Sequence, residues 1–273
     1  MTENNQIEKL VNLLSSKYST TLSFNSKISD FQTRFPTPLI LDKNYNYEIA
    51  LTWFTTYNNI FNINNSNNIF KISYGNSTQI LKITPGSYEL ETLFTEMRKL
   101  INEVNNKIYK VDLEKIKTDW KNFQREEKDD RKTTPIDFKI NMTTSRSECF
   151  VYAGFSFYPD KLSNVLGFTQ EKYSENSTSE KYINISNITS INLICDLIEG
   201  TYQDGKRNNC LYNFPYGTVP HGYKIIQIIN TPIYLPINKK TIDSIRFKIV
   251  DQEDNLLDFN SENISFSLHL KQV

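Results

Sequence analysis

Apolar and polar residues alternate most clearly near the C-terminus of this 273-residue chain. In residues 244–250, three apolar side chains, Ile245, Phe247 and Ile249, alternate with basic ones. Residues 264–271 repeat the pattern, with an apolar side chain at every even-numbered position. A period of two is typical of a strand that has one face in a core and the other in water. The pattern predicts a β-protein whose C-terminal residues lie within a sheet.

Further strand-like segments follow at short intervals along the rest of the chain. They are rich in β-branched and aromatic residues, which favour strands. Residues 75–77, Gly-Asn-Ser, have the chemistry of a tight turn and predict a hairpin between the two segments beside them. The expected strands cover residues 20–24, 45–57, 69–74, 78–84, 136–143, 149–158, 182–185, 190–198 and 211–214.

Helical spacing of apolar residues is confined to a few segments. Residues 7–14 place four apolar side chains on one helical face, which predicts a short amphipathic helix. This helix packs on its own domain, stays mobile, or docks on a neighbouring subunit. A second helix is expected after Ser87, which would be its N-cap, with an apolar stripe over residues 90–101. Residues 160–168 predict a helical turn that Gly167 closes.

Residues 105–134 form the most charged part of the chain. Basic and acidic residues interleave there, which is typical of a solvated helical or loop insertion and not of a nucleic-acid-binding patch. Ile116, Trp120 and Phe123 would share one helical face and tether the insertion to the protein.

No linker rich in Pro, Gly or Ser divides the chain, and no internal repeat is visible. We therefore expect an amphipathic arm over residues 1–18 and one domain over residues 19–273, with the insertion at about 105–134. The number of strands predicts an all-β sandwich of two antiparallel sheets around an aromatic core. Because a jelly roll accommodates long excursions between strands, the specific expectation is a single jelly roll with short helical insertions.

Charge and composition exclude several classes of partner. Lys and Arg number 31, as do Asp and Glu, so the formal net charge is zero and we expect no specific nucleic-acid partner. No signal sequence and no apolar run long enough to cross a bilayer are present, so we expect a soluble, intracellularly made protein without a membrane span. Cys149, Cys195 and Cys210 lack metal-ligand spacing, and Cys195 has the parity of a core residue.

The sequence contains no convergent set of catalytic or metal-binding residues. His221 and His269, the two histidines, have no second His or Cys at ligand spacing, and surface or loop roles are expected for both. The acidic run 251–254 favours a hydrated or capped β-turn over a cation site. Asp196 and Glu199 are expected to end a strand. We therefore predict no catalytic residue, no cofactor, no metal and no enzymatic activity.

The order and spacing of residues in the C-terminal third resemble the minor capsid (penton) protein of the Polinton/Maverick elements and the related adintoviruses. Many short segments carry this resemblance together, and the N-terminal half matches only in general layout, including 86–90 and 166–168. The segments are 191–202 (INLICDLIEGTY), 204–206 (DGK), 211–212 (LY), 220–225 (PHGYKI), 231–238 (TPIYLPIN), 242–246 (IDSIR), 251–259 (DQEDNLLDF), Glu262 and 264–270 (ISFSLHL).

The resemblance implies a single jelly roll that forms homopentamers at icosahedral vertices, beside a double-jelly-roll major capsid protein. It implies a location in the virion at the capsid vertex, after synthesis and assembly inside the host cell. Loops at one end of the subunit would face outward, toward a possible host receptor. The other end and the N-terminal arm would contact the shell.

Two other functions remain open from the residues alone. A lectin-like or receptor-binding sandwich would recognise glycans through surface aromatic residues with Asn and Asp. A jelly-roll hydrolase or metal-dependent oxygenase is disfavoured because the histidines that such a metal site needs are missing.

Overall fold

The computed structural model describes residues 18–123, 134–186, 188–203, 205–217 and 219–273. They form two compact units, each with its own hydrophobic core. Unit 1 joins the described residues up to Ile60 to Ile188–Val273, and unit 2 lies within Phe61–Asn187. This division differs from the single domain expected over residues 19–273. The chain passes between the units without a Pro-, Gly- or Ser-rich linker, so composition gave no sign of the boundary.

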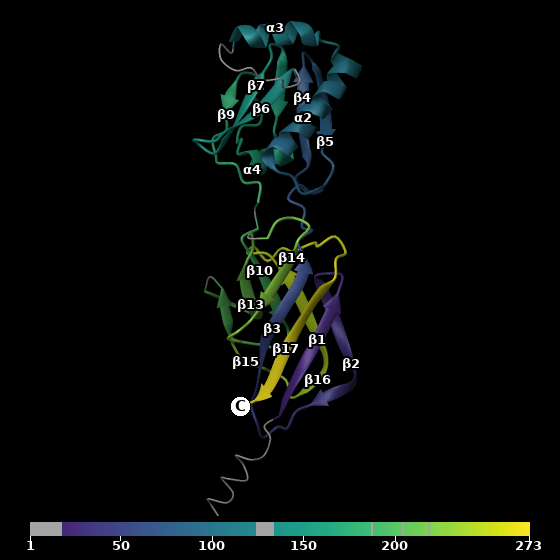
Figure 1. Cartoon of the computed structure of the whole chain (residues 1–273), viewed down its shortest axis with the longest axis vertical. Helices are drawn as coiled ribbons and strands as arrows, with labels where there is room; N and C mark the ends of the chain where they lie inside the picture. The colour runs from purple at the N-terminus through teal and green to yellow at the C-terminus, as the bar shows by residue number, and fades with distance from the viewer. Residues whose placement is uncertain (1–17, 124–133, 187, 204, 218) are drawn as a thin grey trace, which may run out of the picture. The chain divides into compact units, whose positions relative to one another are not determined.

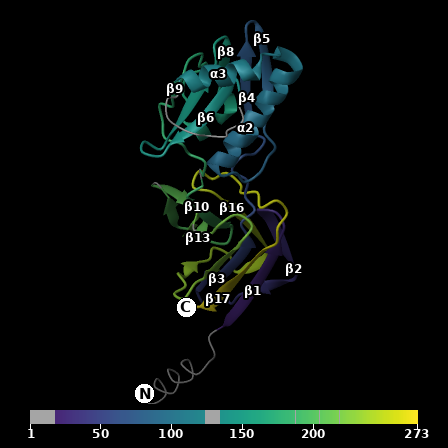
Figure 2. The same ribbon diagram turned by 45° about the horizontal axis from the view of Figure 1, so that its top comes forward.

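Unit 1 is a sandwich of two antiparallel sheets. In Figures 1 and 2, β3, β17 and β1 run side by side in the first sheet. That sheet has the order β1 (Ser19–Ser26), β17 (Ile264–Gln272), β3 (Tyr47–Tyr57) and β14 (Lys224–Ile228), and the short β15 (Leu235–Pro236) also pairs with β3. The second sheet has the order β13 (Cys210–Pro215), β10 (Ser190–Cys195), β16 (Thr241–Val250) and β2 (Asp30–Ile40).

The connectivity of these eight strands is that of a jelly roll. Numbered along the chain, they follow the order 1-8-3-6 in the first sheet and 5-4-7-2 in the second. Strands next to each other in sequence therefore often lie in different sheets, as two interlocked Greek keys require. The all-β jelly-roll prediction is confirmed. A small hairpin of β11 (Thr201–Gln203) and β12 (Lys206–Asn208) is added between β10 and β13.

Phenylalanine rings fill the core between the two sheets. The Phe247 ring centroid lies 4.6 Å from that of Phe24 and 4.9 Å from that of Phe266. Ile245 and Ile249 are fully buried beside them. The alternation predicted for β16 and β17 is confirmed: their apolar parity faces this core, and burying it stabilises the sandwich.

Unit 2 interrupts the jelly roll between β3 and β10 and contains two small sheets and several helices. The predicted hairpin at Gly75 is confirmed. One sheet has the order β5 (Ser77–Lys82), β4 (Ile69–Tyr74) and β8 (Phe155–Tyr158), and the other has β6 (Ile136–Asn141), β7 (Arg146–Val151) and β9 (Ser177–Thr178). The helical segments are α2 (Leu90–Val104), η1 (Asn105–Tyr109), α3 (Leu113–Phe123), η2 (Asp160–Leu162) and α4 (Ser163–Leu166).

Helix α2 buries the predicted apolar stripe against β6. The Phe94 ring stacks on Phe138 at 5.7 Å, and Arg98 forms an ion pair of 2.5 Å with Asp137. The predicted N-cap was wrong by two residues: the cap position is Glu89, with extended backbone and no side-chain capping bond. The residues before it are held instead by Asn62, whose Oδ1 accepts a bond from the Tyr88 N–H at 2.9 Å.

Other sequence predictions for unit 2 need correction. Residues 149–158 form two strands, not one, because Gly154 turns the chain at φ +86°. Residues 182–185 are not a strand; single backbone bonds from Ile183 and Asn184 hold them in place of a ladder. Within the charged insertion, η1 and α3 are helical and Ile116 is buried, while the side chains of Trp120 and Phe123 lie outside the described part. Residues 1–17 of the arm predicted over residues 1–18 also lie outside it.

Candidate assembly surfaces

The three cysteines carry free thiols. Cys149 lies in the core of unit 2, and Cys195 lies in the core of unit 1, as its parity predicted. Burial raises the pKa of Cys195 to about 12 and that of the partly buried Cys210 to about 11. Both thiols stay protonated at neutral pH, and a protonated thiol is neither a nucleophile nor a metal ligand.

His269 lies on the outward face of β17, between two hydroxyl groups. Its Nε2 is 2.7 Å from Ser19 Oγ, and its Nδ1 is 2.7 Å from Tyr234 Oη. A serine–histidine contact is part of a Ser-His-Asp catalytic triad. Here a phenol takes the place of the aspartate, and it carries no negative charge to stabilise an imidazolium. The arrangement links β1 and β17 to the segment before β15. His221 is exposed in a turn.

The acidic residues considered as possible sites are bound to neighbours in the structure. Asp251 Oδ1 accepts backbone bonds from Glu253 at 2.8 Å and Asn255 at 2.9 Å, which is the capped turn that the sequence favoured. Asp196 accepts the Arg246 N–H at 3.0 Å, and Glu199 forms an ion pair of 2.6 Å with Arg207. These contacts account for the two carboxylates as strand-end groups.

The described residues include neither a cluster of metal ligands nor a membrane-spanning helix. No group of three or more His, Cys, Asp or Glu side chains in that part of the chain is arranged to hold a metal ion. No helix there is long and apolar enough to cross a membrane.

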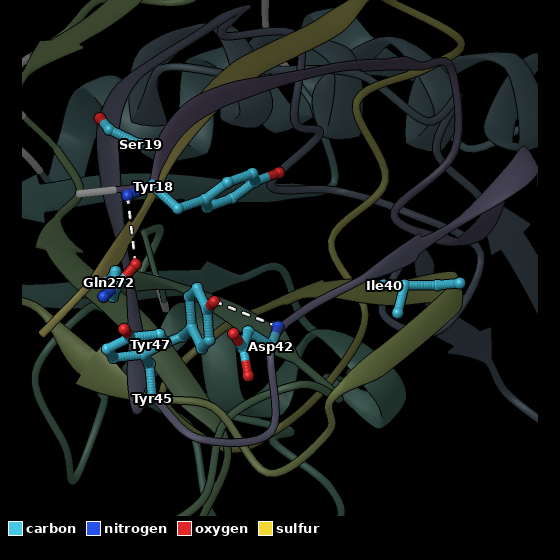
Figure 3. A pocket seen from close by; sticks show the side chains of 7 residues that line it. All are labelled: Tyr18, Ser19, Ile40, Asp42, Tyr45, Tyr47 and Gln272. Atoms are coloured by element: carbon cyan, nitrogen blue, oxygen red, sulfur yellow. Dashed lines mark hydrogen bonds between the residues drawn. The ribbon is translucent and has the colours of Figure 1, made fainter. Parts of the chain in front are cut away.

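A polar hollow of about 540 Å³ opens at the start of β1 (Figure 3). Tyr47 Oη accepts the Asp42 N–H at 3.2 Å, and Gln272 Oε1 accepts the Tyr18 N–H at 3.3 Å. The Tyr18 and Tyr47 rings meet edge to face at 5.9 Å. Aromatic faces beside a carboxylate and an amide suit a ligand rich in hydroxyl groups. The lining residues are Tyr18, Ser19, Ile40, Asp42, Tyr45, Tyr47 and Gln272.

The outward face of the second sheet is charged. Asp30 on β2 lies opposite Lys248 on β16, and Gln32 lies opposite Arg246. Arg246 Nη2 is 2.7 Å from Asp30 Oδ2 across these strands. Paired charges of both signs keep a sheet face hydrated, so this surface is typical of one that remains in water.

The outward face of the first sheet is different, because two complete cross-strand rows contain no charged residue. Each row takes one residue from each of β1, β17, β3 and β14. One end of each row is small and polar, and the other is bulky and apolar. The rows are Asn25, Ser265, Thr55 and Ile226, and Ser23, Ser267, Trp53 and Ile228, of which Ser267 is buried beneath its neighbours.

None of these surface residues was predicted as a site from the sequence. The signal was present, because residues 45–57 and 224–229 are apolar on both parities, whereas a strand with one wet face alternates. Parity alone does not say which of two apolar faces is turned inward. In the structure, Phe54 and Ile225 are on the inward face and are buried, while Trp53 and Ile226 are on the outward face.

Comparisons with known proteins agree with the jelly-roll architecture. No protein-family model matches the sequence, and no curated protein matches it significantly. Among solved structures, the crystal structure of the mavirus penton protein is similar, with a TM-score of 0.50 and 14% sequence identity. The alignment covers 94% of this chain and 100% of the mavirus chain in that crystal structure, so it includes both units. At this identity the likeness concerns architecture, and we conclude that the chain has the fold of a viral penton protein.

Proposed function

We propose that this chain is a non-catalytic penton subunit of a viral capsid, which forms homopentamers at icosahedral vertices. The observation that carries the proposal is the structural alignment with the mavirus penton protein over the whole of its crystallised chain. The segments over residues 191–270 that resemble Polinton/Maverick and adintovirus pentons support the same role, and we propose that lineage for the chain.

The proposed mechanism is geometric. Identical subunits that meet head to tail close into a ring when the rotation per subunit matches the symmetry. A zero net charge avoids repulsion between the copies. The remaining partner is a double-jelly-roll major capsid protein, which the arm over residues 1–18 contacts. In the virion, outward loops at the vertex reach a host receptor.

The mass of the purified full chain in solution tests this function. Light scattering and negative-stain images should reveal rings of five times the 32.0 kDa chain mass, alone or with the major capsid protein present. A protein that stays monomeric at every concentration, even with the shell protein added, would contradict the proposal.

A second candidate function is glycan or receptor binding, and the hollow beside Tyr18 favours it. Its tyrosines and the Asp42 carboxylate are groups that hold sugar rings and their hydroxyls. A glycan array tests this candidate, with a Tyr45→Ala variant as the comparison. A hit that a free monosaccharide inhibits and that Tyr45→Ala loses would support it, and an array without hits would remove it.

A further inference from the structure

The outward surface of β3 and β14 carries a contiguous apolar patch. Trp53 is 37% exposed, Ile226 57% and Ile228 71%. Ile228 lies directly opposite Trp53, and Ile226 lies opposite the neighbouring Thr55, so the side chains adjoin one another. Scattered exposed apolar residues are ordinary, but a contiguous group within two uncharged rows of a sheet face indicates an interaction site.

Strand β14 also ends its sheet without the usual protection of an edge. Its sequence, KIIQI, has no proline, and its one charge is at Lys224, whose ammonium lies 5.5 Å from the Tyr57 ring. The edge strand β2 of the second sheet, in contrast, carries Pro36 and Pro38. Natural sheets guard exposed edges with proline or charge. The unguarded edge of β14 therefore fits one that another protein covers.

The opposite edge of the same sheet carries small polar residues. Strand β1 reads STTLSFNS and contains neither a charge nor a proline. Its outward residues Ser23 and Asn25, with Ser265 beside them on β17, are small. A surface of small polar residues leaves room for bulky side chains from a neighbour. One sheet thus carries bulky apolar side chains at one edge and small uncharged side chains at the other.

The charges on this surface decide between kinds of partner. A nucleic acid needs lysines or arginines on the contact surface, and the two central rows have none. A second copy of this chain supplies the uncharged β1 side as a matching surface. Because the two complementary halves lie at opposite edges, the contact joins different surfaces of the two copies and can repeat around a ring.

We propose that Trp53, Ile226 and Ile228 form the apolar centre of a contact in which the β3–β14 side of one copy packs against the β1 side of a second copy. The inference rests on the proposed function, because it requires the chain to assemble with itself. Trp53 is the anchor of the contact, since aromatic residues at an uncharged centre dominate binding at interfaces.

The main experiment places a carboxylate in the patch of the full-length protein. Ile228→Asp would bury an unpaired charge in the contact, so we expect self-association to weaken at least 100-fold by sedimentation or light scattering. The matched control is Ile80→Asp, because Ile80 is also a strand isoleucine and is 67% exposed, but lies in unit 2. Circular dichroism and the melting temperature of both variants establish that they are folded.

Each outcome separates this inference from the proposed function. A wild-type ring that survives in Ile80→Asp and dissociates in Ile228→Asp supports both. A ring that persists unchanged in Ile228→Asp overturns the inference and leaves the penton function intact. A monomeric wild type that binds the shell protein through Ile228 overturns a second copy as the occupant. A chain that remains monomeric with or without shell protein overturns both.

A second experiment tests the head-to-tail orientation. In a Cys210→Ser background, Ser23→Cys and Ile228→Cys proteins are prepared separately, mixed and treated with a short bis-maleimide. We expect a covalent pair in the mixture and little in either protein alone. A pair that forms equally well in Ile228→Cys alone, or no pair in a mixture that is still multimeric, overturns the proposed contact.

Discussion

Arg246 holds Asp30 with two hydrogen bonds across β16 and β2, from Nε to Oδ1 at 2.8 Å and from Nη2 to Oδ2 at 2.7 Å. These bonds lower the pKa of Asp30, and the partial burial of the carboxyl group opposes them only in part. The pair lies at the edge of the second sheet, whereas the surface that we propose for assembly lies on the first sheet.

The first prediction concerns acid stability. Because the pKa of Asp30 is lower in the folded protein, its contribution is complete above the unfolded pKa of about 3.9 and is lost as the pH falls through the folded value. Between about pH 5 and about pH 3, the wild type should therefore lose slightly more stability than Asp30→Asn. Urea midpoints at the two pH values measure this, and equal losses would show that the pair has no such role.

The second prediction concerns the aromatic core of unit 1. Phe266 is fully buried, with Phe24 and Phe247 at 5.4 and 4.9 Å. Phe266→Ala leaves a cavity between the sheets and should lower the free energy of unfolding by about 3–5 kcal/mol. Tyr202→Ala, at an exposed position, should change it by less than about 0.5 kcal/mol. Chemical denaturation followed by circular dichroism compares the two, and similar small effects would contradict the placement of Phe266.

The third prediction concerns Gly167, which ends α4 with φ +81°. A Cβ at this position would lie 2.3 Å from the carbonyl oxygen of Lys181. Gly167→Ala therefore combines an unfavourable backbone conformation with a backbone clash and should cost about 3 kcal/mol or more. Gly75 has a similar positive φ but open space around it, so Gly75→Ala should cost only about 1 kcal/mol. Melting temperatures rank the variants, and a reversed order would refute this account.

The fourth prediction concerns thiol chemistry. With a pKa raised to about 11, Cys210 should be alkylated by iodoacetamide at pH 8 about 100-fold more slowly than an unperturbed cysteine. The fully buried Cys149 and Cys195 should react only when the protein unfolds. Mass spectrometry of the native and urea-treated protein distinguishes the three residues. Rapid labelling of Cys195 in the native protein would be incompatible with its place in the core.

The alternation of apolar and polar residues was sufficient to predict strands that have one solvent-exposed face. Residues 244–250 and 264–271 alternate, and both segments lie in the sandwich as predicted. It failed for β2, which sequence analysis missed. Pro36 and Pro38 in that segment argue against a strand, and an edge position tolerates them because it needs fewer ladder bonds.

The division into two separate cores could not be predicted from the sequence, for another reason. Phe70 and Phe247 have equally apolar surroundings along the chain, yet they belong to different clusters. Periodicity gives the buried face of an element and not the element against which it packs. The same limit applied to the proposed assembly surface, because the outward position of Ile226 depends on the register of β14 with β3.

The position of unit 2 within the jelly roll has a consequence for biosynthesis. In the described structure β1 and β2 pair only with β17 and β16, and β3 pairs only with β14, β15 and β17. On the ribosome, the first three strands of the sandwich must therefore wait without partners while all of unit 2 emerges and can fold. A premature stop before Ile264 would remove β17 and leave β1 unpaired. Such a product would expose the aromatic core of the sandwich, and chaperones and proteases recognise exposed apolar surface of this kind.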